Sequence, residues 1–281
     1  MEILKGITVA NAINEKIMEE AKLLPGAAPH LTIVRVGERP DDLAYERGAL
    51  KKMEKVGFTC EVKTFPETIT NEAFLEAFDA INADPAVDGI LLFKPLPKHL
   101  DEKEAERRID PMKDLDGISP INMAKVYAGD PSGFAPCTAE AVIEMLDFAG
   151  IDLTGKRVSV VGRSTVIGKP AAMLLMKKNA TVTVCHTKTK DLEGTCQNAE
   201  ILVAAAGSAR MIRPEHVAQD AVVIDVGINV DAEGNLCGDV DFDAVCEKTS
   251  LITPVPGGVG SVTTSVLAKH LLSAAKRRRK Q

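Results

Sequence analysis

Short apolar and β-branched runs alternate along most of the chain with segments whose apolar residues recur at helical spacing. This alternation is typical of parallel sheets covered by helices, so it predicts an α/β protein. In the first half we expect strands at residues 31–36, 60–65 and 89–93, and helices at residues 9–23, 46–56 and 71–81. In the second half we expect strands at residues 158–161, 181–185, 201–204, 222–226 and 251–253, and helices at residues 139–148, 171–176 and 263–275. The short β-branched strands fit a buried parallel sheet.

A loop containing glycine and proline at residues 129–133 separates the two halves of this pattern. A chain of 281 residues can form two modest domains, each with its own core. We expect a first domain over residues 1–138 and a second over residues 139–261, with Thr138 capping the helix that follows it. The final segment, residues 262–281, is expected to return to the first domain as a helix.

Composition excludes several classes of protein. The net charge of −6 argues against a general nucleic-acid binder, and the basic run at residues 276–280 is most often a solvated helix end. The six cysteines form no Cys-x-x-Cys pair, and no histidine follows one of them at metal-ligand spacing. They therefore indicate reduced thiols rather than a metal site. The N-terminus lacks the apolar core of a signal peptide, and no apolar run approaches the ~20 residues of a membrane span. We therefore expect a cytoplasmic protein with no membrane or nucleic-acid partner.

The most informative segment is a buried strand at residues 158–161 that runs into a glycine turn and then into an apolar helix. This arrangement presents backbone N–H groups to a phosphate. Only Gly162 and Gly168 of the common Gly-x-Gly-x-x-Gly pattern are present, and Arg163 and Ser164 stand where the middle glycine would be. On this segment alone, an ordinary strand-turn-helix remains an alternative to a nucleotide site.

The choice of nucleotide depends on the end of the next strand. NAD-binding folds carry an acidic residue there, ~20 residues past the turn, but this chain has His186, Thr187 and Lys188 after Cys185. Arg163 and Lys188, with His186, would suit the 2′-phosphate of NADP, with hydrogen bonds from Ser164 or Thr187. NADP is therefore favoured and NAD remains possible, although Lys188 taken singly also fits a solvated turn. Asp225, at a strand end, is a further candidate for lining the ligand cleft.

Seven motifs in a fixed order carry a resemblance to a known family. They are Val36-Gly37-Glu38-Arg39-Pro40 with Tyr45, Pro95-Leu96-Pro97, Lys113-Asp114-Leu115-Asp116-Gly117, Pro136-Cys137-Thr138, Gly162-Arg163-Ser164, Thr181-Val182-Thr183-Val184-Cys185-His186 and Pro254-Val255-Pro256-Gly257-Gly258-Val259-Gly260. Together they strongly resemble the methylene-tetrahydrofolate dehydrogenase/cyclohydrolase family, from about Leu31 to the last helix.

The resemblance implies a homodimer whose subunits have a folate cleft between a catalytic domain and a Rossmann-like cofactor domain. Family members oxidise methylene-tetrahydrofolate by hydride transfer to NAD(P), and most also hydrolyse the methenyl product to formyl-tetrahydrofolate. The folate-binding residues implied are Tyr45, Phe93, Pro95, Leu96, Asp116, Gly257 and Gly258, and Tyr45 and Asp116 are also the implied catalytic residues. The cofactor-binding residues implied are Gly162, Arg163, Ser164, Ile167, Gly168, His186, Thr187, Lys188, Ala205, Gly207, Gly227 and Ile228.

The match departs from the family pattern at the folate end. Tyr45 corresponds to the family's tyrosine and Asp116 to its pterin-binding aspartate, but Ala49 stands at the position of the catalytic lysine and Phe93 at that of its glutamine partner. We expect this change to be compensated in volume, with Phe93 filling space beside Ala49. Further departures are a glycine within the same helix, at position 48, and Ser-Val in place of Pro-Met at positions 261–262.

These departures bear on the chemistry. A positioned acid/base group contributes about 10²- to 10⁴-fold to a hydrolytic step, whereas in hydride transfer the cofactor carries the chemistry. We therefore predict a dehydrogenase with little or no cyclohydrolase activity. Lys52, one turn beyond Ala49, is a candidate replacement for the missing lysine, and Lys94 is a weaker one, although most lysines are solvated. Two alternatives stay open: an enzyme for a modified one-carbon carrier, and a catalytically silent paralogue that binds folate or nucleotide.

Overall fold

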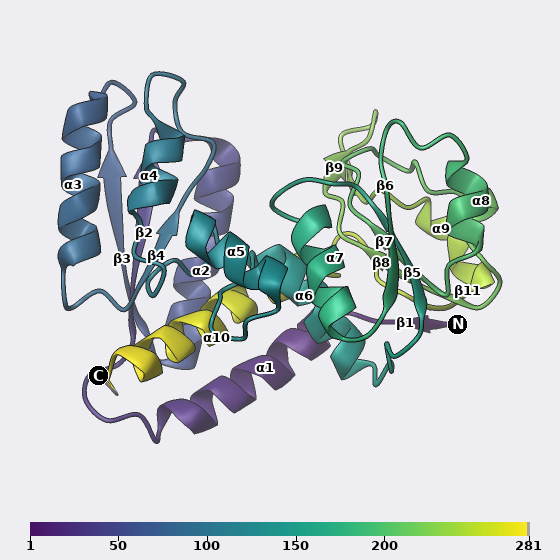
Figure 1. Cartoon of the computed structure of the whole chain (residues 1–281), viewed down its shortest axis with the longest axis horizontal. Helices are drawn as coiled ribbons and strands as arrows, with labels where there is room; N and C mark the ends of the chain where they lie inside the picture. Colours follow the sequence, from purple (N-terminus) through teal and green to yellow (C-terminus); the bar gives the residue numbers. More distant parts are fainter. Residues whose placement is uncertain (280–281) are drawn as a thin grey trace. The chain divides into compact units, whose positions relative to one another are not determined.

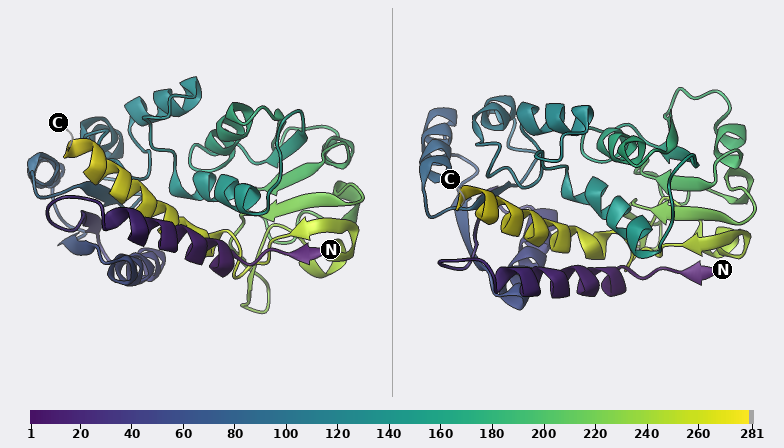
Figure 2. Two further views of the ribbon diagram at one scale, coloured as in Figure 1. Left: turned by 90° about the horizontal axis from the view of Figure 1, so that it is seen from below. Right: turned by 60° about the horizontal axis from the view of Figure 1, so that its bottom comes forward.

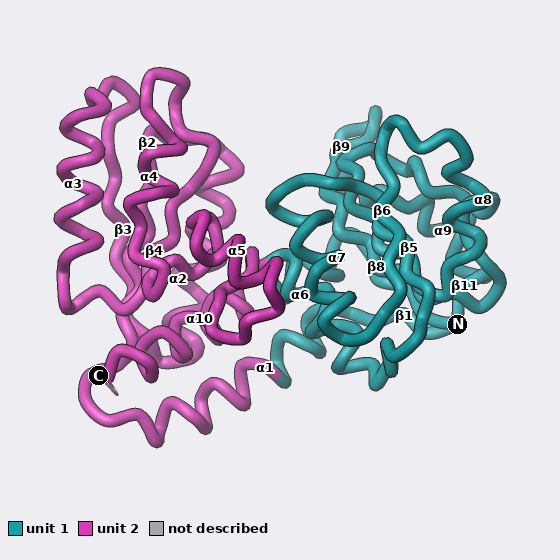
Figure 3. Tube along the Cα trace, in the orientation of Figure 1, with its two compact units in different colours: residues 1–12, 138–263 teal, residues 13–137, 264–281 magenta. Residues whose placement is uncertain are grey.

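The computed structural model describes residues 1–279; Lys280 and Gln281, at the end of the predicted final helix and of the basic run, lie outside the described residues. The chain forms two compact units (Figure 3). Unit 1 contains residues 1–12 and 138–263, and unit 2 contains residues 13–137 and the chain from residue 264 onward. The sequence-based division differs in residues 1–12, which were assigned to the first domain. They join unit 1 because the short strand β1 (Glu2–Ile3) pairs in parallel with β11 (Thr249–Ile252).

Unit 2 is built on a parallel three-stranded sheet in the order β3-β2-β4. Its strands are β2 (His30–Val36), β3 (Thr59–Phe65) and β4 (Gly89–Leu92), and the helices between them are α2 (Pro40–Val56) and α3 (Asn71–Ala83), which confirms the predicted pattern (Figure 1). The structure adds α4 (Glu102–Arg108) and α5 (Pro120–Ala128), which the sequence reading missed. Both are short and start from local caps, the side chains of Asp101 and Ser119, which accept hydrogen bonds from backbone amides in the first turn.

The core of unit 2 explains why its polar residues gather at the strand ends. Phe74 and Phe78 of α3 stack on each other and pack with Val34 of β2 and Ile90 of β4 in one buried cluster. Because the sheet is covered by apolar side chains, polar groups collect where the parallel strands end, which is where open α/β sheets bind ligands. Phe93 follows the carboxyl end of β4 directly.

Unit 1 contains a parallel six-stranded sheet in the order β1-β11-β8-β7-β5-β6. Four of its strands are β5 (Arg157–Val161), β6 (Thr181–Cys185), β7 (Ile201–Ala204) and β8 (Ala221–Asp225), as predicted. Its helices are α6 (Cys137–Phe148), α7 (Gly168–Lys177), α8 (Leu192–Gln197) and α9 (Phe242–Val245), and a hairpin joins β9 (Asn229–Val230) to β10 (Leu236–Cys237). The predicted cap at Thr138 was wrong, because α6 already begins at Cys137.

The order of strands in this sheet reverses direction at β5. The chain proceeds from β5 outward to β6 and then crosses back to β7 on the other side of β5. At such a reversal the loops after neighbouring strands diverge and leave space for a ligand. The loop after β5 begins at Gly162 and the loop after β7 at Ala205. Two predicted cofactor-binding residues therefore begin the loops at this reversal.

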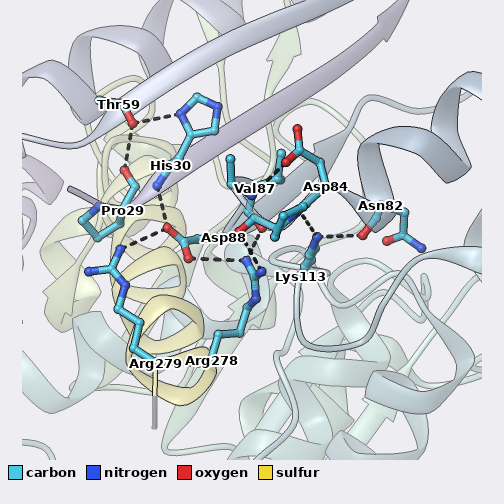
Figure 4. Close-up of polar contacts among 12 residues, drawn as sticks. Pro29, His30, Thr59, Asn82, Asp84, Val87, Asp88, Lys113, Arg278 and Arg279 are labelled. Carbon is cyan, nitrogen blue, oxygen red and sulfur yellow. Dashed lines mark hydrogen bonds and ion pairs between the residues drawn. The ribbon is translucent and has the colours of Figure 1, made fainter. Parts of the chain in front are cut away.

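The final helix is α10 (Gly260–Arg278), and it packs against the first domain as predicted. It runs beside α1 (Gly6–Ala21; Figure 2), and Lys276 Nζ lies 2.5 Å from Glu20 Oε2 of that helix. Beyond it, Arg278 and Arg279 both pair with Asp88, at 3.4 Å (Figure 4). The interpretation of the basic run as a solvated helix end was therefore wrong for the described residues, which anchor the end of α10 to unit 2.

A second polar contact in the same region holds the start of the loop that carries Asp116. Lys113 is buried, and its Nζ donates to the carbonyl oxygens of Asn82 and Asp84 at 2.6 and 2.7 Å (Figure 4). Burial and the neighbouring Arg278 lower the Lys113 pKa below its ordinary value. Among residues 1–279 no helix has both the length and the apolar character of a bilayer span.

Candidate active site

The polar centre of unit 2 is formed by Tyr45 of α2, Asp116 and Cys137. Asp116 Oδ1 accepts a hydrogen bond from the Cys137 backbone N–H at 2.8 Å. Burial raises the pKa of the Asp116 carboxyl, although the bond from Cys137 opposes that shift. Burial also raises the pKa of the Tyr45 phenol well above its usual value, and the neighbouring Cys137 and Asp116 side chains raise it further. Tyr45 is therefore a neutral phenol at physiological pH, able to donate a hydrogen bond.

The turn that presents Asp116 is held by the other aspartate of its motif. Asp114 is fully buried, and its carboxylate accepts hydrogen bonds from the backbone N–H groups of Ile118 and Ser119 at 3.0 and 2.8 Å and from Asn122 Nδ2 at 2.9 Å. Gly117 has a φ of 60°, and a Cβ there would collide with the carbonyl oxygen of Phe134. Asp114 and Gly117 therefore stabilise the turn, and Asp116 is the residue between them that can bind a ligand.

Apolar side chains stand at the two positions where the resemblance implies a lysine and a glutamine. Ala49 is fully buried, and Phe93 packs edge-on against the Tyr45 ring, with centroids 5.8 Å apart and an interplanar angle of 63°. Phe93 thus contacts Tyr45, a residue that the sequence predicts to bind folate. The glycine at position 48 faces α10, since a Cβ there would lie 3.8 Å from Thr264 Cγ2, an ordinary contact distance.

Neither candidate replacement lysine is directed to this centre. Lys52 Nζ donates to Ser265 Oγ of α10 at 2.8 Å and to Asn14 Oδ1 of α1 at 3.3 Å. Burial, with a contribution from Lys55, lowers the Lys52 pKa to about 8. Lys94 Nζ lies 2.5 Å from Glu106 Oε1 of α4, in an ion pair.

The loop after β4 carries two more predicted folate residues, Pro95 and Leu96, and is pinned at both. Arg39 Nη1 donates to the Pro95 carbonyl oxygen at 3.1 Å, and the Leu96 backbone N–H donates to Glu102 Oε2 at 2.8 Å. Arg39 precedes α2, so one side chain ties the start of that helix to the loop beside Phe93.

In unit 1 the two glycines of the turn after β5 permit close backbone approach. Gly162 has a φ of 128°, and a Cβ on it would collide with the Ala205 carbonyl oxygen after β7. A Cβ on Gly168 would collide with the Gly162 carbonyl oxygen. The Ser164 hydroxyl accepts from the backbone N–H groups of Ile167 and Gly168 at 3.0 and 3.4 Å, so it orders the start of α7. Arg163 and Ser164 are exposed, as a phosphate-binding turn requires.

The turn after β6 lies beside this one. Cys185 pairs with Val161, and the Gly162 backbone N–H donates to the Cys185 carbonyl oxygen at 2.9 Å. His186 Nδ1 accepts from the Lys188 backbone N–H at 3.1 Å, which leaves Nε2 as the protonated nitrogen of the neutral ring. Thr187 and Lys188 are exposed. The structure therefore brings the predicted 2′-phosphate candidates together at two adjacent strand ends.

A buried aspartate that the sequence reading missed holds the loop at residues 205–208. Asp239 Oδ2 accepts from the backbone N–H groups of Ala206 and Gly207 at 2.5 and 3.0 Å, and its Oδ1 accepts from the Ser208 N–H at 2.8 Å and from Asn229 Nδ2 at 2.9 Å. Its side chain lies more than thirty residues from the loop in sequence, so no local pattern signalled the contact.

Asp225 holds the backbone on either side of Asp239 and at Gly227. Its carboxylate accepts from the backbone N–H groups of Gly227 and Asp239 at 3.0 Å and of Val240 at 2.9 Å. Burial raises the Asp225 pKa to about 7, and the neighbouring Asp239 carboxylate adds to the shift. Asp225 also lines a hollow of about 240 Å³ that contains predicted residues of both kinds, Gly227 and Ile228 for the cofactor and Gly257 and Gly258 for folate.

Comparison with known proteins identifies the family of this chain. Residues 4–116 match the family model for the tetrahydrofolate dehydrogenase/cyclohydrolase catalytic domain, and residues 136–279 match that for its NAD(P)-binding domain. The chain belongs to the tetrahydrofolate dehydrogenase/cyclohydrolase family. It is 55% identical to the "Bifunctional protein FolD" of Clostridioides difficile (strain 630) over 277 residues, which cover 98% of this chain and 96% of that one.

Solved structures of the tetrahydrofolate dehydrogenase/cyclohydrolase family agree. The bifunctional enzyme FolD from Campylobacter jejuni matches with a TM-score of 0.96 and 38% identity, covering 99% of both chains. The Trypanosoma brucei enzyme, solved with NADP cofactor and inhibitor, matches with a TM-score of 0.92 and 36% identity, covering 99% of this chain and 98% of that one. The NAD(P)-binding domain at residues 136–279, together with that NADP complex, supports NADP as the cofactor.

Proposed function

We propose that this family member catalyses NADP-dependent oxidation of methylene-tetrahydrofolate to methenyl-tetrahydrofolate, with weak or absent cyclohydrolase activity. The observation that carries the proposal is the contrast inside unit 2. Tyr45 and Asp116, the predicted ligand-binding pair, are present, and the Cys137 backbone N–H holds Asp116. The positions of the acid/base pair hold Ala49 and Phe93, and Phe93 packs against Tyr45.

At the folate end, each retained residue has a role suited to its environment. The Asp116 carboxylate can accept two N–H bonds from the edge of the pterin ring, and burial strengthens such bonds. Tyr45, a neutral phenol whose pKa burial raises further, offers a donor hydroxyl and an aromatic face. Phe93, Pro95 and Leu96 then supply the apolar wall beside it. Gly257 and Gly258 form a glycine-rich edge that lets a ligand approach the backbone.

At the cofactor end, the binding chemistry favours a phosphorylated ribose. The glycine turn after β5 offers backbone N–H groups to the pyrophosphate, and Arg163 and Lys188 suit a 2′-phosphate. The end of β6 holds no acid that would repel this phosphate. We assign the ordered loop at Ala205–Gly207 and the hollow at Gly227 and Ile228 to the nicotinamide half. The bound nucleotide accepts the hydride, and the protein orients it and excludes water.

Loss of hydrolysis follows from the missing acid/base group. Lys52 is committed to Ser265 and Asn14, and Lys94 to Glu106, so we propose that neither replaces the family's lysine. Without a positioned group, attack of water on the methenyl carbon loses about 10²- to 10⁴-fold. The methenyl product then leaves for hydrolysis elsewhere.

The test is a coupled measurement on one sample. The purified protein is given methylene-tetrahydrofolate with NADP or with NAD, and reduced nicotinamide, methenyl-tetrahydrofolate and formyl-tetrahydrofolate are followed together. We expect reduction of NADP with accumulation of methenyl-tetrahydrofolate. No reduction with either nucleotide would leave a silent paralogue or an enzyme for a modified carrier.

The modified-carrier alternative also draws on the Tyr45–Phe93 contact, because an apolar wall beside the tyrosine reshapes the pocket. It predicts weak turnover of methylene-tetrahydrofolate and stronger turnover of another one-carbon carrier. A panel of carriers that differ only in the pterin ring, assayed with NADP, separates the two: preference for the unmodified ring rejects this alternative.

We further propose a cytoplasmic homodimer. The six cysteines are all free thiols, as expected in a reducing compartment. Strand β6 forms one edge of the unit 1 sheet and leaves Val184 37% exposed, and an uncovered edge strand with apolar side chains readily pairs with a second copy. Light scattering of the wild type should give the mass of a dimer, and Val184→Lys should shift it toward the monomer.

A further inference from the structure

Helix α10 sends a buried histidine to the turn that carries Asp116. His270 is 4% exposed, and its Nδ1 lies 2.8 Å from the Leu115 carbonyl oxygen. A carbonyl oxygen can only accept, so Nδ1 carries the proton and donates it to this bond. Leu115 is adjacent to Asp116, and His270 thus bonds directly to the backbone of the folate turn.

The thiol of Cys137 completes a small clamp around the same carbonyl. Cys137 Sγ donates to the Leu115 carbonyl oxygen at 3.4 Å and lies 3.8 Å from His270 Nδ1. The Cys137 backbone N–H holds Asp116 Oδ1. Residues 115 and 116 are therefore held by both Cys137 and His270, the latter more than 150 residues away in sequence.

The histidine ring is itself held by a stack of side chains. The Phe134 ring lies against it, with centroids 5.0 Å apart, and the Arg277 guanidinium covers the outer face of Phe134 at 4.7 Å from its centroid. Arg277 Nη1 also donates to the Ser132 carbonyl oxygen at 2.5 Å. These contacts pack against the imidazole beside its directional hydrogen bond to Leu115.

We propose that His270 is a positioning residue for Asp116: it orients the Leu115–Asp116 turn so that the carboxylate meets the pterin ring. The inference rests on the proposed function of Asp116 in folate binding. The C-terminal helix thus contributes to substrate binding indirectly. In this role His270 touches neither substrate nor cofactor, so no binding motif in the helix sequence indicates it.

The test compares three replacements of one side chain. His270→Asn places an amide nitrogen near the position of Nδ1, whereas His270→Gln is polar and of similar size but moves its donor to the position of Nε2. His270→Ala removes the donor altogether. We expect Ala and Gln to raise KM for methylene-tetrahydrofolate about 3- to 10-fold, the value of one net hydrogen bond, with KM for NADP unchanged and Asn within about twofold of wild type.

A matched pair of neighbours on α10 controls for simple loosening of the helix. Arg277→Gln removes the guanidinium over Phe134 and should raise the folate KM in the same sense, but less. Lys276→Gln removes an equal charge that pairs with Glu20 on α1, and it should leave both KM values unchanged. Thermal unfolding of each variant shows which of them fold. If the His270→Ala variant does not fold, the comparison of His270→Asn with His270→Gln tests the positioning role.

The outcomes separate this inference from the proposed function. If wild type oxidises methylene-tetrahydrofolate and the Gln and Ala variants keep its KM, His270 has no positioning role. An equal rise in both KM values, with Asn no better than Gln, also rejects the role. If wild type oxidises no folate, the proposed function fails, and calorimetric binding of tetrahydrofolate to the same variants still tests His270 directly.

Discussion

The ring of Phe93 meets the ring of Tyr45 edge to face, with centroids 5.8 Å apart. Because Phe93 stands where the resemblance places a glutamine, this contact puts hydrocarbon beside the tyrosine where the family places a polar group. Aromatic pairs of this geometry contribute about 0.5–1.5 kcal/mol beyond their buried area, so the replacement is a packed arrangement rather than a void. The proposed folate end thus keeps Tyr45 with an apolar neighbour beside it.

Restoring the polar pair should restore hydrolysis. In the double variant Ala49→Lys, Phe93→Gln we expect the ratio of formyl to methenyl product to rise about 10²-fold, because a positioned acid/base group returns. Ala49→Lys alone should mainly lower the free energy of unfolding, since it buries an unpaired ammonium. Product ratios by chromatography and urea unfolding check both. An unchanged ratio in a folded double variant would show that other changes removed the activity.

Nucleotide preference should depend on the basic residues at the ends of β5 and β6. Arg163→Gln or Lys188→Gln is expected to raise KM for NADP about tenfold and to leave KM for NAD within about twofold, because only the 2′-phosphate contact is lost. Lys177→Gln, at the end of α7, is the matched control and should change neither. Equal effects on both nucleotides would place these side chains elsewhere on the cofactor.

The buried carboxylate of Asp239 should matter to both stability and cofactor binding. Asp239→Asn replaces an acceptor with a donor that faces backbone N–H groups, so we expect a loss of about 1–3 kcal/mol in the free energy of unfolding and a higher KM for NADP. Asp243→Asn, an exposed substitution nearby, should change neither. Chemical unfolding and initial rates provide the measurements, and a fully stable Asp239→Asn protein would contradict the role.

Asp225 should give stability a specific pH dependence. Its folded pKa of about 7 lies above that of an unfolded aspartate, about 3.9, so the unfolded state loses its proton first as pH rises. The contribution of Asp225 is thus fully present below about pH 4, falls between about pH 4 and 7, and is level above that range. In urea unfolding, wild type should lose stability relative to Asp225→Asn between pH 5 and pH 8. A constant difference between the two proteins across that interval would refute the shift.

Local signals predicted the strands and the cofactor turn, because a glycine turn between a buried strand and a helix depends on neighbouring residues. Residues 1–12, predicted as part of the first domain, fall in unit 1 of the contact division because β1 pairs with a strand about 250 residues away. Asp239 and His270 were missed for the same reason, since each acts on a turn far from it in sequence. The basic end of α10 looked solvated because its partners, including Asp88, are brought to it only by the fold.

The folate site was predicted only in part. The resemblance supplied Tyr45 and Asp116, and the sequence exposed the departures at Ala49 and Phe93, but not the orientation of Phe93 toward Tyr45. Nor could helical spacing show that Lys52 turns to Ser265 and Asn14, because the direction of a long side chain is set by the helices that surround it.

The most direct test of the central claim is the ratio of cyclohydrolase to dehydrogenase turnover in the wild-type protein. Enzyme, methylene-tetrahydrofolate and NADP are mixed and stopped at intervals, and formyl- and methenyl-tetrahydrofolate are quantified against NADPH. The uncatalysed hydrolysis of methenyl-tetrahydrofolate in the same buffer is the baseline. We predict that methenyl-tetrahydrofolate accumulates in step with NADPH and that formyl-tetrahydrofolate forms no faster than this baseline. Formation of formyl-tetrahydrofolate at a rate comparable with NADPH would contradict the account.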